Sequence, residues 1–255
     1  MIDTHTHLCD PVYSIDRATV LAHARAVGVT HVISVSETLA DVIFNLKLAE
    51  IHPEVYVAAG LYPANLDLDE AQQIIEIIDK GADKLIAIGE VGLDYWVVKE
   101  EEERAIQRSI FRSFIDLSLS TGLPLNIHSR SAGKVVVDLL LEKGAQRVQL
   151  HAFDGKASSA MPAVEAGYYF SIPTSIVRSK QKQKLVKQLP LSAILLETDS
   201  PVLAVDPDDR NEPANITIAL DAIAEIKNEN PEVVREMVTE NTLKLYKGLK
   251  IYDDF

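Results

Sequence analysis

At 255 residues the chain is long enough to bury a substantial core, and length alone allows one large α/β domain or two smaller ones. Thirty-eight acidic residues against 25 basic ones give a formal net charge of −13, which argues against a broad electrostatic surface for duplex DNA. The single cysteine, Cys9, excludes an internal disulfide, and no apolar run is long enough to span a bilayer. We therefore expect a cytoplasmic protein with no membrane partner.

Short apolar runs alternate with longer amphipathic segments along the whole chain. After an apolar start over residues 1–8, the short runs predict strands at 31–35, 55–61, 84–91, 124–128, 146–151, 168–172 and 193–199. The longer segments predict helices at 14–27, with Ser14 as N-cap, and at 39–50, 68–80, 100–121, 132–143, 157–166, 177–188, 213–227 and 231–247. Eight strand-then-helix units predict a (β/α)8 TIM barrel with an additional C-terminal helix, and a doubly wound open sheet is the alternative. No linker or shift in composition divides the chain, so we expect residues 1–255 to form a single domain.

Two histidines one residue apart, His5 and His7, end the first apolar segment. In a β-strand successive side chains point to opposite faces, so this pair shares a face and could hold one metal ion. Imidazole is the commonest neutral metal ligand in proteins. Taken alone, the pair is equally compatible with two polar residues that hydrogen-bond at a strand end.

In a TIM barrel, catalytic side chains come from the carboxyl ends of the strands and from the loops that follow them. Five of the eight predicted strands end on side chains that can bind a metal ion, namely His5 and His7, Glu90, His128, His151, and Asp199. Singly, each could instead satisfy a buried hydrogen bond or cap the next helix. Together on one rim they indicate a metal site. The remaining histidines, His23, His31 and His52, fall in helices or at a strand start, and we interpret them as surface or packing residues.

Six ligands exceed the three protein side chains of a catalytic mononuclear zinc site. The sequence therefore favours a binuclear centre, with two divalent ions about 3.5–4 Å apart as cofactors. Mixed nitrogen and oxygen donors suit Zn²⁺ or Mn²⁺, whereas Mg²⁺ is less natural beside so much imidazole.

The segments DTHTHL, AIGEVGLDYW, PLNIHSR, LHAF and ETDSPVL follow one another in this order. As an ordered set they resemble the TatD family of metal-dependent nucleases in the amidohydrolase superfamily, over nearly the whole chain. The resemblance implies a 3′–5′ exodeoxyribonuclease or phosphodiesterase activity on DNA or a nucleotide-type phosphodiester, with no obligate protein partner. It also implies that Glu90 bridges the two ions and that the metal ligands are His5, His7, Glu90, His128, His151 and Asp199.

The chain departs from the family pattern at two positions. Tyr62 stands where the family usually has a phosphate-holding histidine, and Ser131 stands where an acidic residue is frequent. Both departures leave the metal ligands intact and bear on the substrate. The alternatives to a nuclease are therefore a hydrolase of a small amide, ester or lactone, and a metal-binding barrel without turnover.

Several side chains near the ligands are candidates for catalysis or substrate contact. Asp199 is expected to orient the attacking water and accept its proton, with Glu90 as the second catalytic carboxylate. Arg130 is expected to bind phosphate oxygens, unless it forms a surface ion pair, and Tyr62 can donate a hydrogen bond without bringing positive charge. Asp94 is expected at the substrate or behind a histidine. Three aromatic side chains could stack on a base or line a loop, namely Tyr95, Trp96 and Phe153.

Overall fold

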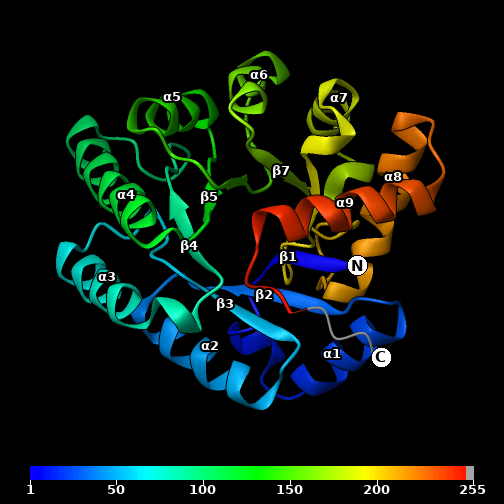
Figure 1. The fold of residues 1–255 in the computed structure, drawn as a ribbon, viewed down its shortest axis with the longest axis horizontal. Helices are drawn as coiled ribbons and strands as arrows, with labels where there is room; N and C mark the ends of the chain where they lie inside the picture. Colours follow the sequence, from blue (N-terminus) through cyan, green and yellow to red (C-terminus); the bar gives the residue numbers. More distant parts are fainter. Residues whose placement is uncertain (251–255) are drawn as a thin grey trace.

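The computed structural model describes residues 1–250, which contain an eight-stranded parallel sheet with the strands in sequence order (Figure 1). The strands are β1 (Ile2–Thr6), β2 (His31–Val35), β3 (Val55–Ala59), β4 (Ala87–Gly92), β5 (Leu125–His128), β6 (Val148–Leu150), β7 (Tyr169–Ile172) and β8 (Ile194–Leu196). The first strand meets the segment after the last one, because Thr6 bridges Ser200 and the His7 amide donates to the Ser200 carbonyl at 2.8 Å. This closure confirms the predicted TIM barrel rather than a doubly wound open sheet.

The helices form a ring outside the barrel, as parallel strands require crossover connections (Figure 1). They are α1 (Arg17–Ala26), α2 (Leu39–Ile51), α3 (Leu68–Gly81), α4 (Glu101–Thr121), α5 (Gly133–Lys143), α6 (Ala157–Glu165), α7 (Lys180–Gln188), α8 (Ile216–Lys227) and α9 (Pro231–Leu245). The predicted additional C-terminal helix is α9, which crosses one end of the barrel. Within residues 1–250, no helix combines the length and apolarity that a bilayer crossing demands.

Five predicted boundaries were wrong by three residues. The first helix begins at Arg17 rather than at Ser14, because Pro11–Tyr13 forms a 3₁₀ turn in which the Asp10 carboxylate accepts from the Val12 amide. Helix α7 begins after a second 3₁₀ turn, Thr174–Val177, and its N-cap is Ser179. Strand β8 ends before Asp199, where the backbone takes a positive φ of 56°. Strand β4 begins at Ala87 rather than at residue 84, and α8 begins at Ile216 because Pro213–Asn215 forms a 3₁₀ turn.

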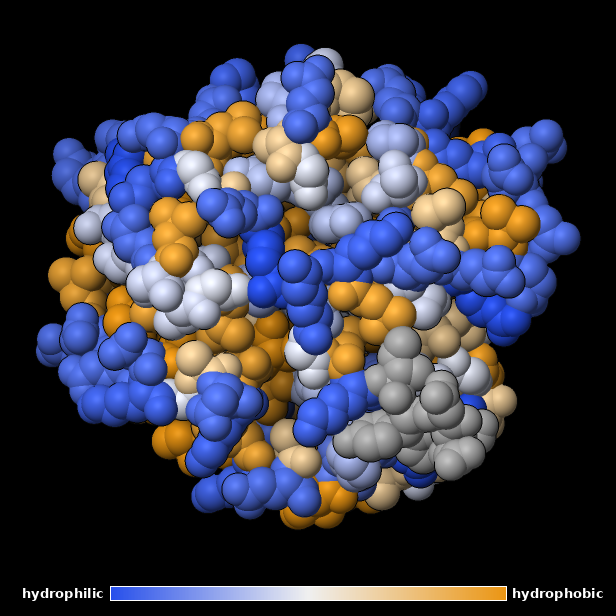
Figure 2. Space-filling model, in the orientation of Figure 1, coloured by the Kyte–Doolittle hydropathy of each residue, from blue (hydrophilic) through white to orange (hydrophobic). Residues whose placement is uncertain are grey.

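A small apolar cluster seals the amino end of the barrel beneath α9. Tyr246, which follows α9, packs there with side chains from five strands, including Ile2, Ile33 and Leu195. Burial of these apolar groups is worth roughly 1.5–3 kcal/mol for each large side chain. The open end of the barrel is therefore the opposite one, where the strands finish. Figure 2 shows the sealed face, with hydrophilic side chains on the outer helices and apolar residues between them.

A polar layer fills the barrel between this seal and the strand ends. The Asn126 side chain donates to the Thr4 carbonyl at 2.9 Å, and Gln149 donates to Ser171 Oγ at 2.8 Å. Tyr246 Oη in turn donates to Gln149 Oε1 at 2.5 Å. In residues 1–250 every buried side-chain nitrogen and oxygen has a hydrogen-bond partner. Such a satisfied network gives the side chains above it a rigid floor.

Candidate metal centre

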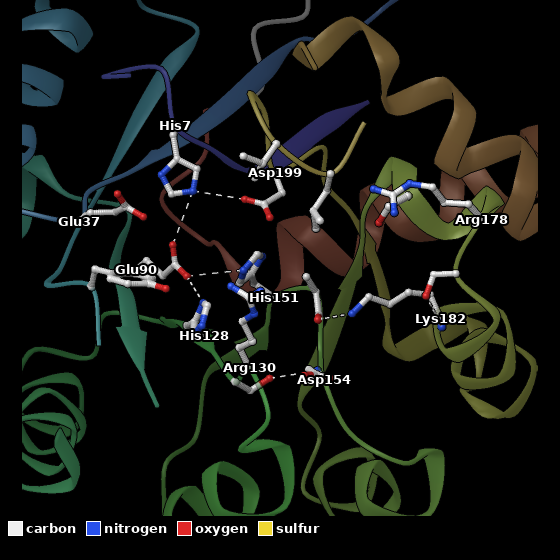
Figure 3. A pocket seen from close by; sticks show the side chains of 17 residues that line it. His7, Glu37, Glu90, His128, Arg130, His151, Asp154, Arg178, Lys182 and Asp199 are labelled. Carbon is white, nitrogen blue, oxygen red and sulfur yellow. Dashed lines mark hydrogen bonds and ion pairs between the residues drawn. The ribbon is translucent and has the colours of Figure 1, made fainter. Parts of the chain in front are cut away.

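All six predicted ligands converge at the carboxyl end of the barrel, and Figure 3 labels five of them, namely His7, Glu90, His128, His151 and Asp199. They form three overlapping groups whose ligand atoms lie within 4.8 Å of one another, namely His5, His7 and Glu90; Glu90, His128 and His151; and His5, His151 and Asp199. The strands that carry them are far apart in the chain, and the closed barrel brings their ends together. Their nitrogen and oxygen atoms form a single layer of possible metal ligands.

Glu90 lies between two pairs of histidines and turns one oxygen toward each pair. Its Oε2 atom is 3.4 Å from His5 Nε2 and 3.6 Å from His7 Nε2. Its Oε1 atom is 2.5 Å from His128 Nδ1 and 3.6 Å from His151 Nε2. The side chain is almost fully buried, so the carboxylate faces the histidines and not water.

Asn126 fixes the orientation of His5. Because the Asn126 amide group donates to Thr4, its Oδ1 atom is the acceptor that faces His5 Nδ1 at 2.8 Å. His5 Nδ1 therefore carries the proton in the neutral ring, and Nε2 presents a lone pair to the site. That Nε2 atom is 3.3 Å from His7 Nε2 and 3.6 Å from Asp199 Oδ1.

His151 and His128 are held by buried carboxylates outside the ligand set. Glu197, fully buried, faces His151 Nδ1 at 3.2 Å, and Asp94, fully buried, faces His128 Nε2 at 3.1 Å. A carboxylate behind a histidine sets its tautomer and raises its basicity as a metal ligand. Each ring then directs its other nitrogen toward Glu90.

The charges in the site perturb its titration strongly. Burial opposes protonation of His5 and of His128, but nearby carboxylates, Glu90 foremost, outweigh it and raise the pKa of His5 to about 10 and that of His128 to about 9. Burial also disfavours charge on Glu90 and Asp199, yet the surrounding histidines lower the pKa of both carboxyls. The six predicted ligands together therefore stabilise positive charge in the site.

The donor set fits divalent cations. Imidazole nitrogens and carboxylate oxygens, the atoms that bind divalent cations, face one another at 3.3–3.6 Å. Burial excludes an isolated excess of negative charge unless a cation or proton compensates it. Mixed imidazole and carboxylate ligation is typical of Zn²⁺ and Mn²⁺ sites.

The predicted substrate contacts are distributed differently from the ligands. Arg130 lines a cavity of about 460 Å³ above the ligands, and its guanidinium lies 5.3 Å from the ring centre of Trp96, which is 58% exposed. Tyr62 lines the same cavity, but its hydroxyl donates to Asp94 Oδ2 at 2.8 Å. Asp94 does not line the cavity, because it is fully buried behind His128 and Tyr62.

The structure does not bring Phe153 to the substrate cavity. Its ring is fully buried and packs edge-to-face on Phe170 with centroids 5.4 Å apart. Two glycines make room for it, because a Cβ atom at Gly133 or Gly155 would lie 2.9 or 2.6 Å from the ring. Tyr95 is similarly occupied, with the Arg104 guanidinium 4.2 Å from its ring centre.

Other residues at the cavity were not predicted as site residues. Glu37 lines the wall near His7, and burial raises the pKa of its carboxyl. Arg178 and Lys182 line the opposite wall (Figure 3). The Lys182 ammonium donates to the carbonyls of Ala152 and Phe153, which follow His151 directly.

The residues interpreted as structural have structural contacts. His23 pairs with Glu212, and His31 contacts the Lys250 carbonyl at 2.8 Å. Burial raises the pKa of the Cys9 thiol to about 12, which keeps it protonated and unreactive. Asn211 is fully buried and donates to the Thr198 carbonyl at 2.9 Å, beside Asp199.

A TIM barrel whose strand ends gather this set of donors defines a metal-dependent hydrolase. A model of the family described as TatD related DNase matches residues 2–247. The chain belongs to the TatD family, as its ordered motifs predict.

Known proteins of this family resemble the chain over nearly its whole length. It is 42% identical over 266 residues to a human protein named deoxyribonuclease TATDN3, covering 98% of this chain and 96% of that protein. It is 32% identical over 256 residues to the uncharacterized metal-dependent hydrolase YabD of Bacillus subtilis, covering 97% and 99%. The crystal structure of YJJV, a TatD homolog from Escherichia coli, superposes with a TM-score of 0.89 at 25% identity and covers 97% of this chain and 98% of its own.

Proposed function

We propose that this protein is a two-metal-ion nuclease that hydrolyses phosphodiester bonds of DNA from the 3′ end. The observation that carries the proposal is the position of Glu90, which directs one oxygen toward His5 and His7 and the other toward His128 and His151. A bridging carboxylate between two ligand sets is the arrangement that a binuclear centre needs. The relatives named deoxyribonuclease support DNA as the substrate over a small amide, ester or lactone.

The ligand groups assign the residues that would hold each ion. One ion would bind His5, His7 and Glu90, and the other would bind Glu90, His128 and His151, with Asp199 beside the first. When bound, divalent cations stabilise charge on the phosphoryl oxygens and lower the pKa of water to near 7. Zn²⁺ and Mn²⁺ are the ions that these donors favour.

The chain's own residues would then orient the substrate and move the proton. The lowered pKa of Asp199 keeps this carboxylate ionised at neutral pH, so it can orient the attacking water and accept its proton. Arg130 lines the cavity and forms no ion pair with a carboxylate of residues 1–250, so its guanidinium is free to bind phosphate oxygens. Tyr62 is committed to Asp94, so phosphate binding falls to Arg130.

The test uses protein stripped of metal and reloaded with Zn²⁺, Mn²⁺ or Mg²⁺. Single-stranded DNA labelled at its 5′ end is expected to shorten one nucleotide at a time, whereas DNA labelled at its 3′ end should release labelled mononucleotide first. The Asp199→Ala variant is the control, because it removes the proton acceptor while the histidines remain. Equal nucleotide release by the wild-type protein and this variant would refute the proposal.

A further inference from the structure

One segment of this acidic chain is strongly basic. Residues 178–188, which comprise Arg178, Ser179 and α7, contain five of the 25 basic residues and no acidic residue. The chain as a whole carries a net charge of −13, so this concentration of positive charge is local. A basic cluster on one helix is the electrostatic feature expected of a surface that binds a polyanion.

The positive charges of this segment are not neutralised by neighbouring side chains. None of its five basic side chains forms an ion pair with a carboxylate within residues 1–250. Basic residues on other helices do form such pairs, as in Lys80 with Glu76 and Lys244 with Glu240. The four exposed basic side chains of the segment therefore attract an anion with a strength reduced by salt, whereas Lys182 is buried and its ammonium is held by two backbone carbonyls.

The basic segment connects the metal centre to a groove between α6 and α7. Arg178 and Lys182 line the metal cavity, whereas Lys184 lines the groove together with Lys156 and Ser158 from the start of α6. Asp154 lines both spaces, so the two adjoin at this residue. Figure 1 shows α6 and α7 side by side on the ring.

The floor of this groove is fixed relative to the metal ligands. Gln181, in the first turn of α7, donates to the Gly155 carbonyl at 2.7 Å, and Lys182 donates to the Phe153 carbonyl at 3.0 Å. Both carbonyls belong to the loop that follows the ligand His151. A strand bound in the groove would thus be held in a constant position relative to the reacting bond.

The groove suits one strand better than a duplex. The unpaired basic residues follow a single helix and the start of its neighbour, whereas the molecule as a whole is acidic. Asp154 is the carboxylate among the described groove residues, and one of its oxygens accepts the Ser131 amide at 2.7 Å. The remaining wall offers lysine ammonium groups, a serine hydroxyl and the Gln188 amide, which are the usual donors to phosphate oxygens.

We propose that the α6–α7 groove, lined by Lys156, Ser158, Gln181 and Lys184, binds the phosphodiester backbone of single-stranded DNA beyond the nucleotide at the metal centre. This inference rests on the proposed function, because the metal cavity must hold the end of the same strand. Arg178 and Lys182 carry the positive charge from the groove to the cavity. The substrate class is accordingly a polynucleotide strand rather than a free mononucleotide.

The test compares the double variant Lys156→Gln/Lys184→Gln with the control variant Lys80→Gln/Lys244→Gln. Both change the net charge equally, but the control residues lie on α3 and α9, away from the groove. For single-stranded DNA of about 20 nucleotides at low salt, the groove variant should raise KM about tenfold and reduce the slope of log affinity against log salt by about 1.4. The control variant should match the wild-type protein in both quantities.

A small chromogenic phosphodiester distinguishes strand binding in the groove from hydrolysis at the metal centre, because it is too short to reach Lys156 or Lys184. The loss shown by the groove variant should be at least about tenfold larger for the DNA strand than for this substrate. Binding is measured in parallel by fluorescence anisotropy with metal-loaded Asp199→Ala protein and the same strand. Equal affinities and salt slopes for the groove and control variants would overturn the groove proposal, whereas a wild-type protein that cuts no DNA would overturn the nuclease proposal instead.

Discussion

Replacement of Glu197 by glutamine tests how the metal ligands are held. Glu197 accepts hydrogen bonds from the Ala152 amide at 2.8 Å and from Ser171 Oγ at 2.5 Å, and it faces His151 Nδ1 at 3.2 Å. A glutamine side chain has one accepting oxygen and one donating nitrogen. If the nitrogen faces His151, Nδ1 must lose its proton and Nε2 must gain one, which removes the lone pair directed at the metal centre.

The opposite orientation is no better, because the glutamine nitrogen would then face the Ala152 amide, and two donors would oppose each other in a buried site. Loss of a carboxylate behind a ligating histidine typically weakens metal binding 10–100-fold, or about 1.4–2.8 kcal/mol. We expect this loss for Glu197→Gln, with nuclease activity restored in part by excess metal.

The measurement is metal affinity by competition with a chelator, at constant pH, on protein whose thermal unfolding confirms the fold. Ser171→Ala is the matched control, because it removes one hydrogen bond to Glu197 and leaves the carboxylate facing His151. This control should bind metal nearly as the wild-type protein does. A Glu197→Gln protein whose metal affinity lies within twofold of the wild-type value would show that the argument from the tautomer is wrong.

Three further outcomes follow from the site. Folding raises the pKa of His5 to about 10 and that of His128 to about 9, above the ordinary 6.5. Protonation of these two rings therefore stabilises the folded, metal-free protein fully below pH 6.5, and this stabilisation is lost as the pH rises through 9 to 10. The unfolding temperature of metal-free protein should fall across this range, and a flat profile would contradict the assignment. Asn211→Ala should lower the free energy of unfolding by about 1–3 kcal/mol in urea titrations, since it leaves buried carbonyls such as that of Thr198 without a donor. Tyr62→Phe should cost about 0.5–1.5 kcal/mol in the same assay and leave metal affinity unchanged, since it removes only the hydrogen bond to Asp94; a large loss of metal would disprove this.

The ligand set could be predicted from sequence because it depends on topology alone. Each ligand follows a short apolar run, and a closed parallel barrel brings the carboxyl ends of all its strands to one face. The prediction required neither the stagger of the strands nor the hydrogen-bond partners of the ligands. For that reason residues as distant as His5 and Asp199 could be assigned to one site.

The residues that support the ligands could not be predicted in the same way. The contact between His5 and Asn126 spans 121 residues, and it depends on the stagger between β1 and β5, which hydrophobic periodicity does not give. A weaker signal was present. Asn126 precedes His128 by two residues on β5, so a period of two places a polar side chain one layer below that ligand.

Phe153 shows that a position just after a ligand-bearing strand does not by itself predict a contact with substrate. It follows a ligand-bearing strand, but Ala152 takes a positive φ of 35° and turns the chain, so the ring enters the core. The space for it comes from Gly133 and Gly155. Only the three-dimensional path of the loop reveals that these glycines and the ring meet.

The position of Trp96 gives the molecule an optical reporter of its own. It is the only tryptophan in the chain, and it is largely exposed beside Arg130, which lines the metal cavity. Indole emission shifts when water leaves the ring and weakens when a nucleobase stacks on it. The arrival of an unlabelled strand at the cavity can therefore be followed in real time from a single emitting side chain, without attaching a dye to either partner.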